Sequence, residues 1–323
     1  MIYSVIVLLL VIAMLLYFRI ADEYNIIDKP NQRSSHTSIT LRGGGIIFPV
    51  AQVFFFFFFG HHTADMPRYA LLLAGILAIA TVSFWDDVSS LSNKIRIIVH
   101  LLAVTILLYA VQAFQLLPVW AVAITYVMII GTINAYNFMD GINGITGVYS
   151  LVILLSCLYF NEKIQPVVHS AYIIIPIMAC LVFLFFNFRK KAKCFAGDVG
   201  SVSIGFWIIS LLLLMIIATG NPKYLFFLSV YGVDASLTIV HRMLLRQNIF
   251  EAHRLHFYQI LVNERKMPHL LVSTIYGALQ LMINIFVLLT GFSFWATGLI
   301  ACLPLALIYL VAKPRLMAAK PAI

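Results

Sequence analysis

Charged residues are scarce in this chain. Only 10% of its 323 residues are Asp, Glu, Lys or Arg, whereas a soluble domain carries about 25%. Apolar residues make up 63% of the chain, and its mean hydropathy is +1.01. So little charge excludes an ordinary soluble protein and predicts an integral membrane protein.

The sequence also lacks the features of several other classes. Its four cysteines, Cys157, Cys180, Cys194 and Cys302, show neither a disulfide framework nor a metal-binding spacing. The longest segment between apolar runs, 241–268, is too short to bury a core. The first run has no basic start and no small-residue cleavage site, so we expect a retained span. Basic residues in cytoplasmic loops, next to anionic lipid headgroups, account for the net charge of +9. We therefore expect no nucleic-acid partner.

Apolar runs of roughly 20 residues, the length that crosses a bilayer, recur eleven times. They cover residues 2–18, 45–59, 69–84, 95–111, 118–134, 144–160, 170–188, 201–218, 224–240, 269–290 and 293–312. We therefore expect an all-α integral membrane protein of about 11 transmembrane helices, which forms a single polytopic domain over residues 1–323.

Basic residues predict the orientation, because Lys and Arg accumulate in cytoplasmic loops. With the N-terminus outside and the C-terminus cytoplasmic, 18 basic residues fall inside and three, Arg68, Lys163 and Lys223, fall outside. The cytoplasmic loops that we expect to form a site are 19–44, 85–94, 135–143, 189–200 and 241–268.

One of these loops contains two adjacent carboxylates. Asp86 and Asp87 lie in FWDDVSSLSNK, at the end of the third run. Neighbouring carboxylates repel each other unless a cation or a basic partner holds them. Mg²⁺ takes one or two carboxylates, several waters and substrate phosphates, which suits aspartates from separate loops. A solvated helix terminus is the alternative interpretation.

Polar residues at helical spacing precede a glycine-rich turn in GTINAYNFMDGINGITG. Asn134, Asn137 and Asp140 are three residues apart and so share roughly one helix face. The glycines that follow permit close approach of the backbone to a ligand. A simple turn between two capped helices is the alternative.

The segment FAGDVGS leads into the eighth run. Its Gly197 and Asp198 lie just before a predicted helix N-terminus, where unpaired N–H groups favour anions. Asp198 is therefore a candidate metal ligand beside a phosphate site. The alternative is that Asp198 or Ser201 caps the helix.

Histidine and arginine residues mark two further loops. His253, Arg254 and His256 lie in a basic setting without a nearby cysteine, which favours phosphate binding over a zinc site. His36 and Arg42 lie in DKPNQRSSHTSITLRGGG, whose closing glycines permit close approach to phosphate or sugar. Basic residues that flank a span are the alternative for this segment.

These five segments, in this order from about Asp28 to Gln259, resemble the polyprenyl-phosphate N-acetylhexosamine-1-phosphate transferases. The first resembles the family's D-x-P-x-x-R-x-x-H segment, and NAYNFMDGING is similar to N-x-x-N-x-x-D-G-x-D-G. The resemblance implies transfer of a sugar-1-phosphate from a UDP-sugar to undecaprenyl phosphate, with release of UMP. It also implies Mg²⁺, with Mn²⁺ as an alternative ion, and a site on the cytoplasmic surface of a bacterial inner membrane.

The resemblance further implies roles for individual residues. Asp198 would bind the metal together with Asp87, Asp86 and Asp87 would serve the lipid phosphate, and Asp140 would lie in the nucleotide and catalytic region. The implied catalytic set is Asp86, Asp87, Asp140, Asp198, His253 and His256. The implied substrate-binding set is His36, Arg42, Asn134, Asn137, Asn187, Gly197 and Arg254.

Three departures from the family pattern stand out: Ser90 and Asn143 replace acidic residues, and Leu41 replaces a proline. FEAHRLHFYQ looks closer to members that act on deoxy-N-acetylhexosamines for O-antigen or capsule. Two other functions remain open, a secondary transporter with ionisable groups near the midplane and a nonenzymatic receptor for lipid-linked sugars. The sequence also leaves open the donor sugar, the pathway and the oligomeric state, a homodimer included.

Overall fold

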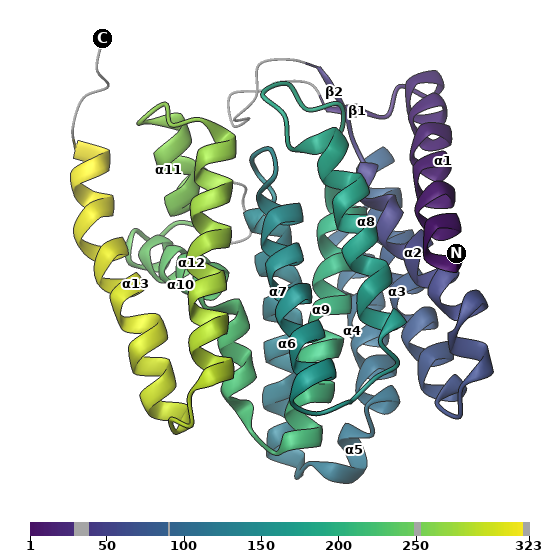
Figure 1. Ribbon diagram of the computed structural model, residues 1–323. Helices are drawn as coiled ribbons and strands as arrows, with labels where there is room; N and C mark the ends of the chain where they lie inside the picture. The colour runs from purple at the N-terminus through teal and green to yellow at the C-terminus, as the bar shows by residue number, and fades with distance from the viewer. Residues whose placement is uncertain (29–38, 90, 249–252, 319–323) are drawn as a thin grey trace.

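The computed structural model describes residues 1–28, 39–89, 91–248 and 253–318. His36 and Ser90 therefore lie outside the described residues. In the part described, the chain is almost wholly helical, with one short strand pair (Figure 1). The elements are α1 (Ile2–Glu23), β1 (Ile27–Asp28), β2 (Thr40–Leu41), η1 (Gly44–Ile46), α2 (Ile47–Phe58), η2 (Gly60–His62), α3 (Met66–Val88), α4 (Asn93–Ala110), α5 (Ala113–Leu116), α6 (Val119–Met139), α7 (Ile145–Lys163), α8 (Ala171–Asn187), α9 (Gly197–Thr219), η3 (Pro222–Leu228), α10 (Ser229–Leu244), α11 (Phe257–Asn263), α12 (His269–Leu289) and α13 (Phe294–Ala318).

The expected membrane architecture is confirmed. Within the described ranges, ten helical segments are long and apolar enough to cross a membrane by length and composition, and α8 is a shorter apolar helix of 17 residues. Each expected run overlaps one of these eleven segments. The ends shift outward by several residues at α3 and α6, because polar residues at a helix end continue the helix after the apolar run stops.

Helix α9 forms the centre of the bundle. Its sequence is apolar on all sides, which is the pattern of a fully buried helix, and every residue from Val199 to Met215 is buried. It packs against α2, α3, α6 and α7 (Figure 1). The first turn of α9 is thereby fixed relative to the ends of four other spans.

The glycine run before α2 crosses the start of α9 at backbone contact distance. A Cβ on Gly45 would lie 2.2 Å from the Cα of Gly200. The N–H groups of Gly44 and Gly45 donate to the carbonyls of Phe195 and Ala196 at 2.8 and 3.0 Å. The close approach that the glycines predict is therefore made to the start of α9, and their predicted approach to phosphate or sugar stays a prediction. This contact places Arg42 beside the start of α9.

A buried polar network accompanies the irregular start of the span Pro222–Leu244. The Oε1 atom of Gln280 accepts bonds from the Tyr149 hydroxyl at 2.7 Å and from the Val230 N–H at 3.0 Å. Its Nε2 atom donates to Asn284 Oδ1 at 2.7 Å, and Asn284 in turn donates to Ser156 Oγ at 2.9 Å. Backbone that leaves the α-helical pattern inside an apolar bundle requires such partners.

Candidate active site

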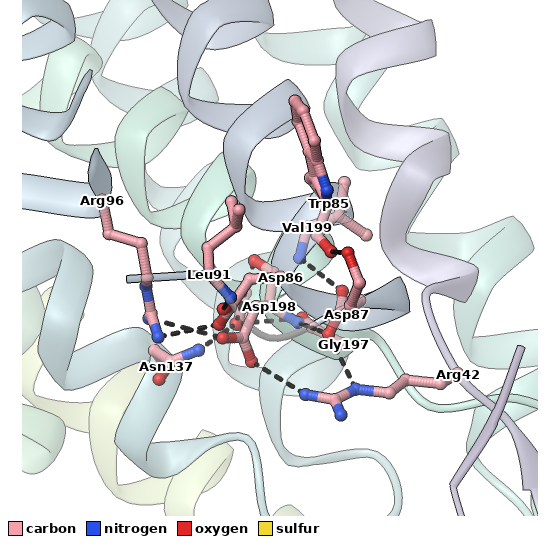
Figure 2. A network of polar contacts seen from close by, with 12 residues as sticks. Arg42, Trp85, Asp86, Asp87, Leu91, Arg96, Asn137, Gly197, Asp198 and Val199 are labelled. Atoms are coloured by element: carbon pink, nitrogen blue, oxygen red, sulfur yellow. Dashed lines mark hydrogen bonds and ion pairs between the residues drawn. The ribbon is translucent and has the colours of Figure 1, made fainter. Parts of the chain in front are cut away.

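Five charged side chains converge near the first turn of α9 (Figure 2). We call Arg42, Asp86, Asp87, Arg96 and Asp198 the acid–arginine ladder. Arg96 Nη1 lies 2.7 Å from Asp86 Oδ2, and Arg42 Nε lies 2.7 Å from Asp87 Oδ1. Asp198 lies between the two arginines, 3.4 Å from Arg42 and 3.5 Å from Arg96. Residues from before η1, from the end of α3, from the start of α4 and from the start of α9 thus share one site. This agrees with the prediction that these segments lie on the same membrane face.

Asp87 is the most deeply enclosed member of the ladder, with a side-chain exposure of 0%. Besides the contact with Arg42, its oxygens accept the backbone N–H groups of Asp198 and Val199, each at 3.0 Å. Asp87 therefore holds the first turn of α9 and one arginine at the same time. Its predicted role as a metal ligand has to compete with these three bonds.

Gly197 makes the turn into α9 possible. Its φ angle is +71°, a conformation that side-chain-bearing residues rarely adopt, and a Cβ there would lie 2.6 Å from Asp87 Oδ2. The predicted importance of Gly197 thus has a structural basis, because it lets the Asp87 carboxylate reach the backbone of α9.

Asp198 has the carboxylate best suited to receive a cation. Its contacts with the arginines are longer than the two 2.7 Å pairs of the ladder, and its side chain is 19% exposed. Two guanidinium groups also leave one of the three carboxylate charges unbalanced. Mg²⁺ uses one or two protein carboxylates and completes its shell with water and phosphate. The donor set therefore fits Mg²⁺ at Asp198.

The histidine loop offers no support for zinc. A zinc site needs at least three protein ligands, and the residues that the structure describes contain no group of three His, Cys, Asp or Glu side chains placed to hold a metal. The sequence alternative of zinc at His253 and His256 thus gains nothing from the geometry.

The end of α6 contributes the next wall. Asn137 Nδ2 donates to Ser201 Oγ at 3.3 Å, which places it against α9, whereas Asn134 donates to a carbonyl of its own helix at 2.9 Å. Asp140 accepts a bond from Thr146 Oγ1 at 2.5 Å. Burial raises the pKa of Asp140 to about 7, and the negative charges of Asp198 and Asp87 add to the shift. Asp140 is therefore close enough to the ladder for the charges of the ladder to influence its pKa.

Asn187 lies under the site with both ends of its amide engaged. Its Oδ1 accepts the Gly144 N–H at 2.7 Å, and its Nδ2 donates to the Cys194 carbonyl at 2.8 Å. Asn143 makes a similar link by donating to the Arg189 carbonyl at 2.7 Å. These amides tie the turn after α6 to the segment before α9. The predicted contact of Asn187 with a nucleotide stays a prediction.

The loop before α11 places two histidine rings 4.8 Å apart, centroid to centroid. His253 Nδ1 accepts the Leu255 N–H at 3.2 Å, so the ring proton resides on Nε2. Burial lowers the pKa of His253 to about 4, and the nearby positive groups of His256 and Arg242 add to the shift. Near neutral pH His253 is thus an uncharged donor, and Arg254 follows it in the same loop.

Tyr258 connects this loop to the rest of the site. Its hydroxyl donates to the Phe138 carbonyl at 2.9 Å, two residues before Asp140. The ring of Phe138 also stacks on His256 at a centroid distance of 6.2 Å. The histidine loop and the Asp140 turn are therefore neighbours, as their predicted common face requires.

Two charged residues of this region were not predicted. The sequence predicted Arg96 only as one of the basic residues on the cytoplasmic side, although it follows Asp86 and Asp87 closely in the chain. Asp234 lies within an apolar run, and a lone carboxylate in a span is itself a signal of function. Arg96 completes the ladder, and Asp234 contacts the histidine loop.

Comparison with known proteins places this geometry in a family. Residues 69–216 match the model of glycosyl transferase family 4. Through these residues, the chain is similar to the members of glycosyl transferase family 4. The matched segment runs from α3 into α9 and includes all members of the ladder except Arg42. The histidine loop lies beyond it.

Proteins similar to this chain occur in several bacteria. It is 26% identical over 265 residues to the probable undecaprenyl-phosphate N-acetylglucosaminyl 1-phosphate transferase of Bacillus subtilis, which covers 76% of this chain and 72% of that protein. It is 26% identical over 211 residues to the undecaprenyl-phosphate alpha-N-acetylglucosaminyl 1-phosphate transferase of Escherichia coli K12. This match covers 60% of this chain and 56% of that protein. The protein of that name from Yersinia pestis is 26% identical over 264 residues, with coverage of 76% and 71%.

Proposed function

We propose that this chain transfers a sugar-1-phosphate from a UDP-sugar to undecaprenyl phosphate and releases UMP. The names of its relatives support this reaction class. The observation that carries the proposal is the position of Asp198, a partly exposed carboxylate between two arginines at the end of a bundle of apolar helices. Such a site serves a reaction between a water-soluble nucleotide sugar and a phosphate attached to a lipid.

The reaction exchanges one phosphorus–oxygen bond for another. An oxygen of the lipid phosphate attacks the sugar-linked phosphorus, and the bond from that phosphorus to the UMP oxygen breaks. UMP leaves with the electron pair, and the product is a lipid diphosphate sugar. The attacking group needs no strong base, because a phosphate monoester with a second pKa near 6 is mostly dianionic at neutral pH.

The protein contributes alignment and positive charge, which are the main requirements of phosphoryl transfer. Arg42 and Arg96 present guanidinium groups that suit phosphate oxygens. His253 offers its Nε2–H to the diphosphate, and His256 lies beside it. Mg²⁺ bound at Asp198, or Mn²⁺ in its place, would neutralise charge on the transferring phosphate. Asp140, at the end of α6 next to the histidine loop, would serve the nucleotide and catalytic region.

We further propose that the site faces the cytoplasm of a bacterial inner membrane, with the N-terminus outside. The support is the distribution of basic residues, 18 of which lie on the site's side under this orientation. The donor would be an N-acetylhexosamine or a deoxy-N-acetylhexosamine linked to UDP. The product would enter assembly of O-antigen, capsule or another envelope glycan.

A reconstituted assay tests this function. The purified protein is incorporated into liposomes with undecaprenyl phosphate, Mg²⁺ and one of several UDP-sugars, and UMP release is followed by chromatography. The lipid product is identified by mass spectrometry. We expect UMP release that requires both the lipid phosphate and Mg²⁺, with one preferred N-acetylated sugar.

Asp198→Asn provides the decisive variant. Loss of one preorganised group that handles transition-state charge lowers kcat by about 100-fold or more. Asp65→Asn is the matched control, because Asp65 also pairs with an arginine, Arg68, at 3.2 Å but lies in a loop remote from the ladder in sequence. UMP release without lipid acceptor would indicate a hydrolase. Uptake of substrate without UMP release would indicate a transporter.

A further inference from the structure

Asp234 is a buried carboxylate that the proposed chemistry does not use. It lies in α10, inside the candidate span Pro222–Leu244, and is only 4% exposed. An ionised group in such a place is costly unless other groups satisfy it. Its partners therefore show what it does.

Among the described residues, the polar contacts of Asp234 beyond its own helix are made with α11, α12 and the histidine loop. Its Oδ1 accepts the Phe257 N–H at 2.8 Å, and its Oδ2 accepts the Tyr276 hydroxyl at 2.7 Å and the Tyr258 N–H at 3.4 Å. His256 Nδ1 lies 3.5 Å from Oδ1. One carboxylate thus holds the start of α11 and faces a histidine ring.

A second buried charge completes this cluster. Thr238 lies one turn after Asp234, and its hydroxyl is bonded to Asp234 Oδ1 at 3.3 Å and to the Tyr309 hydroxyl at 2.7 Å. Lys313, which is 2% exposed, donates to the same Tyr309 hydroxyl. The carboxylate and the ammonium group therefore reach each other through two hydroxyls and bind α10 to α13.

The cluster continues into the proposed site through α11. The Tyr258 hydroxyl bonds to the Phe138 carbonyl at 2.9 Å, and a Cβ on Gly141 would lie 2.2 Å from that hydroxyl. Phe138 and Gly141 flank the Asp140 turn. His256 is 2% exposed, and neither of its ring nitrogens, Nδ1 or Nε2, has a hydrogen-bond partner among the described residues. Asp234 is thus connected to two parts of the site, to His256 directly and to the Asp140 turn through Tyr258.

We propose that Asp234 is a positioning residue, which holds His256 and the Asp140 turn in register by anchoring the start of α11. The proposal rests on the function proposed above. A carboxylate suits this position because the backbone and hydroxyl partners of Asp234 are N–H and O–H donors and a carboxylate only accepts. The carboxylate also lies 3.5 Å from Nδ1 of His256, on the side of the ring away from Nε2.

Asp234→Asn tests the proposal, because its amide N–H group would face donors. We expect kcat to fall by about 10- to 100-fold, the usual effect of removing such a second partner, with KM for the UDP-sugar nearly unchanged. His256→Ala should lower kcat as well, and the loss in the double variant should be smaller than the product of the two single losses, because the part of the Asp234 effect that acts through His256 is already gone. Independent, multiplying effects in the double variant would overturn the proposal.

Asn284→Ala is the matched control for lost stability. Asn284 is equally buried, and its side chain bonds to Gln280 and Ser156 but not to α11. We expect this variant to melt at a lower temperature and to keep its kcat. A kcat of Asp234→Asn equal to that of the wild type would overturn the proposal, whatever its melting temperature.

Two further measurements cover the remaining outcomes. If Asp234→Asn does not fold, Tyr258→Phe removes only the bond to Phe138 and should still lower kcat several-fold; an unchanged kcat contradicts the proposal. Hydrogen exchange at the Phe257 and Tyr258 amides should be faster in Asp234→Asn and does not depend on turnover. A wild-type protein that releases no UMP overturns the proposed function. Unchanged exchange overturns the anchor.

Discussion

Substitution of Asp87 by Asn separates two roles that this carboxylate can have. The wild-type side chain is fully enclosed and accepts bonds from Arg42 Nε and from the N–H groups of Asp198 and Val199. An asparagine has one acceptor oxygen, and its NH₂ group would face one of these donors. If Asp87 is the anchor of α9, this change damages the fold before it affects metal binding.

The structure sets the size of the effect. Breaking a buried ion pair costs about 3–5 kcal/mol, because it leaves a buried charge without its partner. Here Arg42 is 35% exposed, so water compensates part of the loss. The two backbone N–H groups lose a charged acceptor, which adds to the cost. Burial also raises the pKa of Asp87 to about 6, so its ionised form is itself costly in the folded state. We therefore expect Asp87→Asn to lower the free energy of unfolding by at most about 3 kcal/mol.

Thermal unfolding in detergent and Mg²⁺ titration of UMP release measure the two roles separately. We expect Asp87→Asn to melt well below the wild type, while the residual activity keeps a half-saturating Mg²⁺ concentration within about 2-fold of the wild-type value. Asp86→Asn is the matched control, because its partner Arg96 lies at the same 2.7 Å distance but Asp86 is 12% exposed and holds no part of α9. Its melting temperature should fall less.

The opposite pattern would refute this reasoning. If Asp87→Asn melts with the wild type but needs about 10-fold more Mg²⁺, the carboxylate contributes to the metal site. Asp87 would then be a metal ligand, as the sequence resemblance implies. Metal binding would have to break some of the bonds that Asp87 makes with Arg42, Asp198 and Val199.

Three other substitutions, one of them with a matched control, test further parts of the structure. Burial raises the pKa of Asp140 from 3.8 to about 7, so the folded state binds the proton more tightly than the unfolded state, and this carboxyl lowers stability as pH rises from about 4 to 7, by roughly 4 kcal/mol at most. In thermal melts, the advantage of Asp140→Asn over the wild type should therefore grow up to about pH 7 and level off above it; an advantage that does not change with pH would contradict this. A Cβ on Gly200 would lie 2.6 Å from the Cα of Gly45, so Gly200→Ala should cost about 1–3 kcal/mol. Gly232→Ala, which meets nothing within 4 Å, should melt at or above the wild-type temperature. Asn187→Ala should lower the melting temperature, since it leaves a buried N–H and a buried carbonyl unpaired, with KM for the UDP-sugar unchanged; a raised KM would support the predicted nucleotide contact instead.

Composition and periodicity predicted the helices well, because each span is specified by its own residues. The convergence of Asp86, Asp87 and Asp198 also followed from the sequence, since helices that alternate in direction return every second loop to the same face. What the sequence did not show is which charges pair. Arg96 reaches Asp86 and Asp198 only because α4 starts beside the end of α3, and the pattern of residues contains no such distance.

The partner of a local signal could not be predicted where it lay far along the chain. The glycines from Gly43 to Gly45 predicted close approach, and the structure shows that the backbone of α9 is one partner of that approach. Asp234 was overlooked because its apolar neighbours made the segment look like an ordinary span. Its partners are 4 to 42 residues away, and only the folded chain brings them together.

The burial of α9 on all sides has a consequence for biosynthesis. Four of the helices that pack against it, α2, α3, α6 and α7, are earlier in the chain, whereas η3 follows it. Every residue of the acid–arginine ladder precedes Thr219, the last residue of α9. A nascent chain that has just inserted α9 therefore already contains the whole charged half of the site. The final hundred or so residues contain the histidine loop. The two halves of the site can therefore meet only after these residues have been synthesised and have packed against the earlier helices.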